Sequence, residues 1–183
     1  MPDHAEMHEL IYQHSKEIIK ADKIPIVLGG DHSISSGVFR ALKEKYGYLS
    51  CVQIDAHSDL RDSYEGSLFS HASAMARIRE MTDHALQLGI RSMSQAEAER
   101  IKRDNLAVCT MFQFRKKMYD WKKAIEQLPN PVYITFDVDA FDWSVISSTG
   151  TPEPGGFKWD EALEILWGIF SSKNVIGWDI VEL

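Results

Sequence analysis

Short apolar runs alternate with amphipathic stretches along most of the chain. Nearly continuous apolar runs predict buried strands at Ile24–Leu28, Leu49–Ile54, Ala85–Ile90, Leu106–Met111, Val132–Val138 and Val175–Leu183. Helical spacing of apolar positions predicts helices at Met7–Lys20, Ser36–Tyr46, Ser70–Met81, Ser94–Arg103, Met118–Leu128 and Trp159–Phe170. Because strands separated by helices favour parallel pairing with both faces covered, we expect an α/β fold, a three-layer αβα sandwich with a mostly parallel central sheet.

Two segments do not follow this alternation. Asp142–Phe157 is a long irregular stretch rich in Ser, Thr, Gly and Pro, and such loops are usually functional or disordered. Val175–Leu183 is strand-like, and no closing element follows it. We therefore expect residues 1–183 to form a single domain that is part of a longer chain.

Composition narrows the class of protein. Hydrophobic residues make up 44% and charged residues 26%, which is typical of globular proteins. No apolar run reaches the ~20 residues that span a bilayer, and the N-terminus lacks the pattern of a signal peptide. Cys51 and Cys109 lie in strand-like runs and suggest no disulfide framework, so we expect a cytoplasmic protein without a membrane partner.

The net charge of −7 argues against a nucleic-acid partner, because nucleic-acid binding needs clustered Lys and Arg to neutralise phosphates. The same negative charge favours cations, either metal ions or a cationic substrate.

Three clusters of polar residues follow predicted strands. They are Gly29-Gly30-Asp31-His32-Ser33, Asp55-Ala56-His57-Ser58-Asp59 and Asp137-Val138-Asp139. In open α/β sheets, ligands bind beyond the carboxyl ends of the strands, where all three clusters fall. Each cluster taken alone could instead cap a turn or a helix. Together they predict a metal site.

Alternation in extended backbone would point Asp55, His57 and Asp59 to one side, and Asp137 and Asp139 likewise to one side. Carboxylates brought together repel one another, and divalent cations relieve that repulsion. Carboxylate oxygens mixed with imidazole favour ions such as Mn²⁺. Because the candidate ligands outnumber those that one catalytic ion normally takes, we expect two metal ions that share carboxylates.

Two further residues have alternative interpretations. His71 follows the second cluster, and it is either a residue at a helix start or a group that moves protons. Glu182 lies in the last predicted strand, and its carboxylate is either solvated at a frayed end or directed into the site.

The three clusters, in this order, resemble the motifs of the ureohydrolases, the family of arginase, agmatinase and formimidoylglutamase. Supporting matches are Leu88-Gly89-Ile90-Arg91-Ser92, Thr149–Gly156 and Trp178–Glu182. The segment from Asp59 to Gly66, followed by Ser70-His71-Ala72-Ser73, looks most like a prokaryotic agmatinase. The resemblance implies the arginase/deacetylase-like version of the α/β sandwich. It also implies that N-terminal and C-terminal family segments are missing from this chain.

The resemblance implies a role for each residue. One Mn²⁺ would be held by His32, Asp55, Asp59 and Asp137, and a second Mn²⁺ by Asp55, His57, Asp137 and Asp139. Water activated by the two ions would attack the guanidinium carbon, and Asp59 would orient it. His71 would shuttle a proton, and Glu182 would pair with the guanidinium group.

The implied function is a manganese-dependent amidinohydrolase that cleaves a small cationic guanidino substrate to urea and an amine, with agmatine yielding putrescine in polyamine biosynthesis. Other guanidino substrates (guanidinobutyrate, arginine or formimidoylglutamate) and an inactive truncated metal-binding scaffold are the alternatives. The family also implies a homo-oligomer, a trimer or hexamer. The strand order it implies is Ile24–Leu28, Val175–Val181, Val132–Val138, Leu49–Ile54, Ala85–Ile90 and Leu106–Met111. This order places Ile24–Leu28 at an exposed edge of the sheet.

Overall fold

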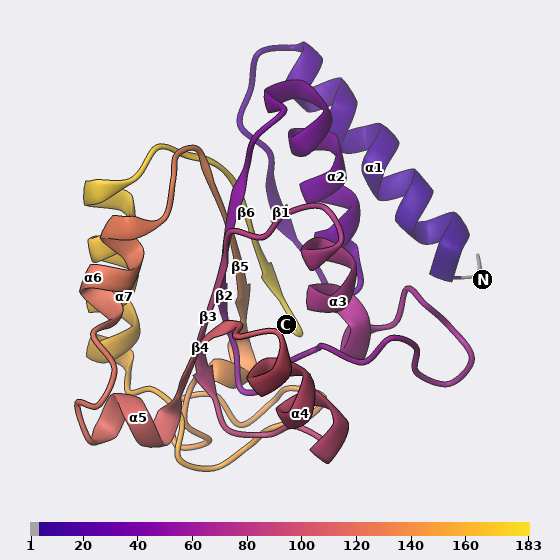
Figure 1. The fold of residues 1–183 in the computed structure, drawn as a ribbon. Coiled ribbons are helices and arrows are strands. Elements are labelled where there is room, and N and C mark those ends of the chain that lie inside the picture. Colours follow the sequence, from indigo (N-terminus) through magenta and orange to yellow (C-terminus); the bar gives the residue numbers. More distant parts are fainter. Residues whose placement is uncertain (1–3) are drawn as a thin grey trace.

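The computed structural model describes residues 4–183, in which six strands form one sheet (Figure 1). From one edge to the other, the strands are β1 (Ile26–Leu28), β6 (Val175–Val181), β5 (Val132–Asp137), β2 (Ser50–Ile54), β3 (Ala85–Ile90) and β4 (Ala107–Thr110). Every neighbouring pair is parallel. This arrangement confirms the predicted parallel sheet and the strand order that the family resemblance implied.

Helices cover both faces of the sheet (Figure 1). One layer contains α1 (His4–Lys20), α2 (Ile34–Tyr46) and α3 (Ala74–Arg79), and the other contains α5 (Met111–Arg115), α6 (Trp121–Gln127) and α7 (Trp159–Ser172). The remaining helix, α4 (Gln95–Arg103), packs through Ile101 against the core of the first layer. The three-layer αβα sandwich is therefore confirmed.

Side chains of the central strands alternate between two hydrophobic cores. In β2, Cys51 packs with the core under α1–α3, whereas Val52 and Ile54 pack with the core under α5–α7. Both cores contain large side chains with almost no exposed surface, such as Phe39 under α1–α3 and Phe157 under α5–α7. The sheet is thus a rigid support whose carboxyl edge carries the loops described below.

The prediction that Ile24–Leu28 is a buried strand is wrong. The strand begins only at Ile26 and pairs with β6 alone, which leaves Ile26 55% and Leu28 70% exposed. A short apolar run shows that a segment can enter a sheet, but it does not show whether neighbours cover both of its sides. The edge position implied by the family resemblance is the one observed.

Several predicted boundaries also differ from the structure, among them those of one helix and one strand. The helix expected at Ser70–Met81 is a 3₁₀ turn at His71–Ser73 followed by the short α3, and the Ser70 side chain makes no capping hydrogen bond. The strand expected to reach Met111 ends at Thr110, whose side chain accepts a hydrogen bond from the Gln113 N–H and starts α5. This capping interaction ends the strand despite the apolar residue that follows.

Cys51 and Cys109 are both buried and free, in agreement with the absence of a disulfide framework. Within residues 4–183, none of the helices combines the length and the apolar character needed to cross a membrane.

Candidate metal centre

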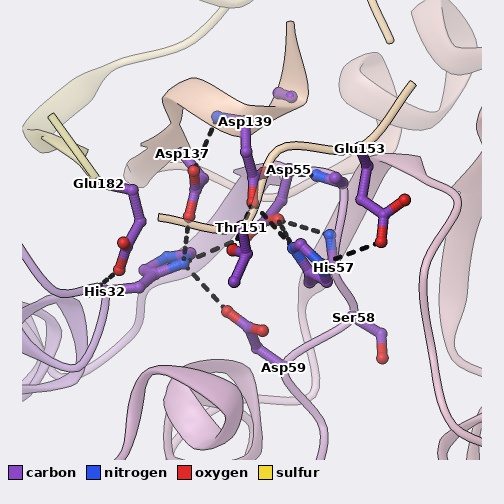
Figure 2. Close-up of polar contacts among 12 residues, drawn as sticks. His32, Asp55, His57, Ser58, Asp59, Asp137, Asp139, Thr151, Glu153 and Glu182 are labelled. Carbon is purple, nitrogen blue, oxygen red and sulfur yellow. Dashed lines mark hydrogen bonds and ion pairs between the residues drawn. The ribbon is translucent and has the colours of Figure 1, made fainter. Parts of the chain in front are cut away.

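The six predicted metal ligands lie together at the carboxyl edge of the sheet (Figure 2). They lie at the ends of three strands: His32 comes after β1, the Asp55–Asp59 segment after β2, and Asp137 and Asp139 at the end of β5. Parallel pairing places these strand ends at the same edge of the sheet, so the fold brings together residues up to 107 positions apart in the sequence.

His32 is the centre of the first group of candidate ligands. Its Nδ1 atom lies 3.0 Å from Asp59 Oδ2, 3.1 Å from Asp55 Oδ2 and 3.2 Å from Asp137 Oδ2. Atoms of His32, Asp55 and Asp59 are close enough to bind one metal ion, and all three residues are buried.

The second group consists of Asp55, His57 and Asp139, which are also close enough to bind one ion. His57 Nδ1 lies 2.8 Å from Asp139 Oδ2 and 3.8 Å from Asp55 Oδ1. Asp55 therefore directs one carboxylate oxygen toward each group. Asp137 contacts His32 through Oδ2, while its Oδ1 accepts a hydrogen bond from the Asp139 N–H.

The side chains converge for a different reason from the one predicted. Strand β2 ends at Ile54, and Asp59 has a φ angle of 51°, in the left-handed region, so the Asp55–Asp59 segment is not extended. Asp139 likewise lies in a 3₁₀ turn, Val138–Ala140. The alternation argument is therefore wrong for both segments, and turns that follow the strands bring the carboxylates together.

A residue that the sequence pattern did not single out holds the turn at Asp59. Glu97 Oε1 accepts hydrogen bonds from Ser58 Oγ at 2.7 Å and from the Leu60 N–H at 3.0 Å, on either side of Asp59. Glu97 Oε2 accepts the Ser94 N–H in a capping box at the start of α4. The Ser-x-x-Glu pattern was the available signal, but it indicated only the helix start.

The geometry around His32 fits a cation. Its ring is 1% exposed, and Nε2 is hydrogen-bonded to Thr135 Oγ1 at 2.8 Å, whereas the buried Nδ1 has no hydrogen-bond partner. A histidine whose second nitrogen is held in this way presents the other nitrogen as a metal ligand. Three carboxylate oxygens face the same point as this unpartnered atom. The donor set of imidazole and carboxylate oxygens suits Mn²⁺ or a similar divalent ion.

The carboxylates show the repulsion that such an ion would relieve. Burial and the neighbouring charges of Asp137, Asp59 and Asp139 raise the pKa of Asp55 well above its usual value. Burial also raises the pKa of Asp137, to about 7, although contact with His32 opposes the change. Two acids that resist ionisation at neutral pH would be returned to their charged forms by a bound cation.

His71 and Glu182 line the same cavity, which has a volume of about 310 Å³. His71 Nδ1 lies 3.4 Å from Asp31 Oδ2, and this contact raises the pKa of His71. Glu182 is fixed in place: its Oε1 accepts the His32 N–H at 2.8 Å, and its backbone N–H donates to Gly30 O at 2.6 Å. Glu182 is therefore neither frayed nor fully solvated.

The long irregular segment Asp142–Phe157 lies against the site and is held by Arg91. The Arg91 guanidinium donates hydrogen bonds to the carbonyl oxygens of Asp139 at 2.7 Å, Glu153 at 2.8 Å and Pro154 at 3.0 Å. Glu153 then lies beyond His57, with Oε1 3.7 Å from Nε2 (Figure 2). Arg91, which entered the sequence analysis only within a family motif, thus joins this loop to the turn that carries Asp139.

The fold and the site define an α/β protein with clustered metal-binding histidines and aspartates at the carboxyl edge of a parallel sheet. Residues 1–183 match the model of the arginase family, and the chain belongs to that family.

Three relatives show the range of this similarity. The chain is 34% identical over 178 residues to an N(1)-aminopropylagmatine ureohydrolase of Thermus thermophilus, covering 97% of this chain and 61% of that protein. The structure of the agmatine ureohydrolase of Thermoplasma volcanium is 30% identical with a TM-score of 0.87, covering 99% of this chain and 61% of that one. The structure of formimidoylglutamase from Bacillus subtilis is 31% identical with a TM-score of 0.86, covering 96% of this chain and 59% of that one. The chain thus spans about three-fifths of the length of these relatives.

Proposed function

We propose that this protein is a binuclear metal hydrolase that cleaves a guanidino group to urea and an amine, with agmatine or N(1)-aminopropylagmatine as substrate. The observation that carries the proposal is the pair of ligand groups that share Asp55, with Glu182 on the wall of the same cavity. Relatives named for agmatine and aminopropylagmatine support the substrate class. A cytoplasmic location and assembly into a homo-oligomer, as the family resemblance implies, belong to the same proposal.

Two Mn²⁺ ions are the proposed cofactors. His32, Asp55, Asp59 and Asp137 would hold one ion, and Asp55, His57, Asp137 and Asp139 would hold the other. When bound, the ions would supply Lewis acidity that makes water nucleophilic near neutral pH.

The protein's own side chains would bind the substrate and move protons. Glu182 Oε1 is occupied by the His32 N–H, and Oε2 remains to accept a hydrogen bond from the planar guanidinium group. Asp59, held by the turn that Glu97 fixes, would orient the attacking water. His71 lies on the cavity wall with its ring partly exposed, so it could pass a proton to the leaving amine or to solvent.

A substrate panel tests the proposal. The Mn²⁺-loaded protein should release urea from agmatine or N(1)-aminopropylagmatine faster than from arginine or guanidinobutyrate, measured as kcat/KM. Turnover confined to arginine or guanidinobutyrate would contradict the substrate assignment. Formimidoylglutamate should be included, because a formimidoylglutamase shares this fold, and its hydrolysis is followed through the glutamate formed. Absence of turnover with every compound would favour the inactive scaffold.

The contact between His71 and Asp31 predicts a change in pH dependence. Because this contact raises the pKa of His71, the residue keeps its proton to higher pH and can act as an acid there. Asp31→Asn should lower that pKa, so the alkaline limb of the kcat/KM profile should move to lower pH. An unchanged limb would exclude His71 as the proton donor. Metal content should be measured in parallel, since Asp31 precedes His32.

A further inference from the structure

A row of four buried polar residues crosses the sheet directly beneath the metal centre. Asp179 on β6, Thr135 on β5, Gln53 on β2 and Gln87 on β3 are register neighbours from strand to strand, and each is 0% exposed. The row lies two residues before Asp55 and Asp137 on their strands. Buried polar side chains in the middle of parallel strands are costly unless every polar group finds a partner.

One end of the row is connected to a cation. Gln87 Oε1 accepts hydrogen bonds from Arg79 Nε at 3.3 Å and from Arg79 Nη2 at 3.2 Å. Arg79 lies at the end of α3, and Nη2 also donates to the Ala85 carbonyl oxygen. In the structure, no carboxylate of residues 4–183 forms an ion pair with Arg79. The side-chain partner of the Arg79 guanidinium is therefore the amide oxygen of Gln87.

The two glutamines continue this chain to the metal centre. Gln87 Nε2 donates to Gln53 Oε1 at 2.5 Å and to the Ser58 carbonyl oxygen at 2.8 Å. Gln53 Nε2 donates to Asp55 Oδ2 at 2.6 Å and to the His57 carbonyl oxygen at 3.3 Å. All four amide protons of the two side chains are thus used, and each acceptor belongs either to the other glutamine or to the Asp55–Asp59 segment.

The chain can run in only one direction. Arg79 can only donate hydrogen bonds, and the Asp55 carboxylate, in the ionised form that binds metal, can only accept them. Arg79 therefore turns the oxygen of Gln87 toward itself, which leaves the Gln87 amide nitrogen for Gln53. Gln53 must in turn present its own nitrogen to Asp55. The orientation of an amide two side chains away is thus fixed by the guanidinium of Arg79.

We propose that Gln53 and Gln87 are positioning residues, oriented by Arg79, that hold the Asp55 carboxylate in the geometry in which it binds both metal ions. This inference rests on the proposed metal centre and adds residues that do not touch the ions or the substrate. Gln53 Nε2 donates hydrogen bonds to Asp55 Oδ2 and to the His57 carbonyl oxygen. These two bonds set the direction in which both oxygens of the Asp55 carboxylate point. Outer hydrogen bonds of this kind typically change metal affinity by about 10- to 100-fold.

Gln87→Glu tests the direction of the chain. A carboxylate at residue 87 still accepts from Arg79 and gains an ion pair, but it cannot donate to Gln53. The Gln53 amide should then reverse, donate to Glu at position 87 and present its oxygen to Asp55 Oδ2. We expect Mn²⁺ affinity, measured by titration calorimetry on metal-stripped protein, to fall about 10- to 100-fold. The unfolding temperature of the metal-free protein should also fall, because the Ser58 carbonyl oxygen loses its donor, so affinities are compared at a temperature at which both proteins are folded.

The matched control is Gln127→Glu, which makes the same chemical change on an exposed part of α6 and should leave Mn²⁺ affinity unchanged. Gln53→Met is the second variant, because it removes the hydrogen bonds that Gln53 donates to Asp55 Oδ2 and to the His57 carbonyl oxygen without adding charge. It should also weaken Mn²⁺ binding, and adding Gln87→Glu to it should cause a smaller loss than in the wild-type protein, since only the hydrogen bond from Gln87 to the Ser58 carbonyl oxygen remains to be removed.

The outcomes separate this inference from the proposed function. Wild-type affinity for Mn²⁺ in both Gln87→Glu and Gln53→Met would overturn the positioning role while leaving the metal centre intact. Additive losses in the double variant would overturn the chain as a single unit. If the wild-type protein itself bound no Mn²⁺, the proposed metal centre would fail, and this inference with it.

Discussion

Asp55→Ala should remove both metal ions and reduce urea release to the background rate, whereas Asp139→Ala should leave one ion bound. The reason is that Asp55 directs Oδ2 toward His32 and Oδ1 toward His57, while Asp139 contacts only the second group. Metal analysis per chain, together with a urea assay on agmatine, measures both effects. Asp137→Ala should resemble Asp55→Ala if Asp137 also serves both ions.

The control for this experiment is the stability of the metal-free protein. Burial and neighbouring carboxylates raise the pKa of Asp55, so in the absence of metal the charged side chain opposes folding at neutral pH. Asp55→Ala removes this cost but also the hydrogen bonds that Asp55 accepts from Gln53 and from the His57 N–H, so the variant should remain folded without metal. Equal metal loss in Asp55→Ala and Asp139→Ala would contradict the assignment of Asp55 to both sites.

Glu182→Gln should lower kcat/KM for urea release by one to two orders of magnitude. The substitution keeps the size of the side chain but removes the charge that pairs with a cationic guanidinium group. A charged hydrogen bond contributes about 1.5–3 kcal/mol, and each ~1.4 kcal/mol corresponds to a tenfold change in rate. Metal content should remain at the wild-type level, because Glu182 contacts the His32 backbone and not the ring nitrogen that faces the carboxylates.

Glu126→Gln is the matched control, since Glu126 is exposed on α6 and does not line the cavity that contains Glu182. It should leave kcat/KM unchanged. Near-normal activity of Glu182→Gln would remove the guanidinium-binding role. Loss of activity accompanied by loss of metal would instead show that Glu182 acts by holding His32, whose N–H it accepts.

The sequence predicted the location of the site well because that location depends on local pattern. Each of the three clusters follows a predicted apolar strand, and parallel strands align their carboxyl ends at one edge. His32, Asp55 and Asp137 could therefore be placed together without knowledge of their contacts. His71 and Glu182 were less certain from sequence, since a single histidine or glutamate carries no spacing signal.

The sequence could not predict how the ligands are held. Asp59 adopts a left-handed φ. Glu97, 38 residues further along the chain, accepts hydrogen bonds from the residues on either side of Asp59. Gln53 and Gln87 interrupt apolar strands, which was a visible sign of buried polar groups, but their partners depend on strand register. Contacts between distant segments arise only when the sheet forms.

The sequence by itself therefore determined the α/β class, the strand ends that carry the site and the donor types that suit a divalent cation. These features follow from periodicity and from side-chain chemistry, which are properties of neighbouring residues. Only the tertiary structure decided that turns bring the carboxylates together, that Glu97 holds the turn at Asp59 and that Arg79 reaches Asp55 through two amides. Each of these depends on which strands become neighbours and in which register, because burial and hydrogen-bond direction are set by packing across the whole sheet.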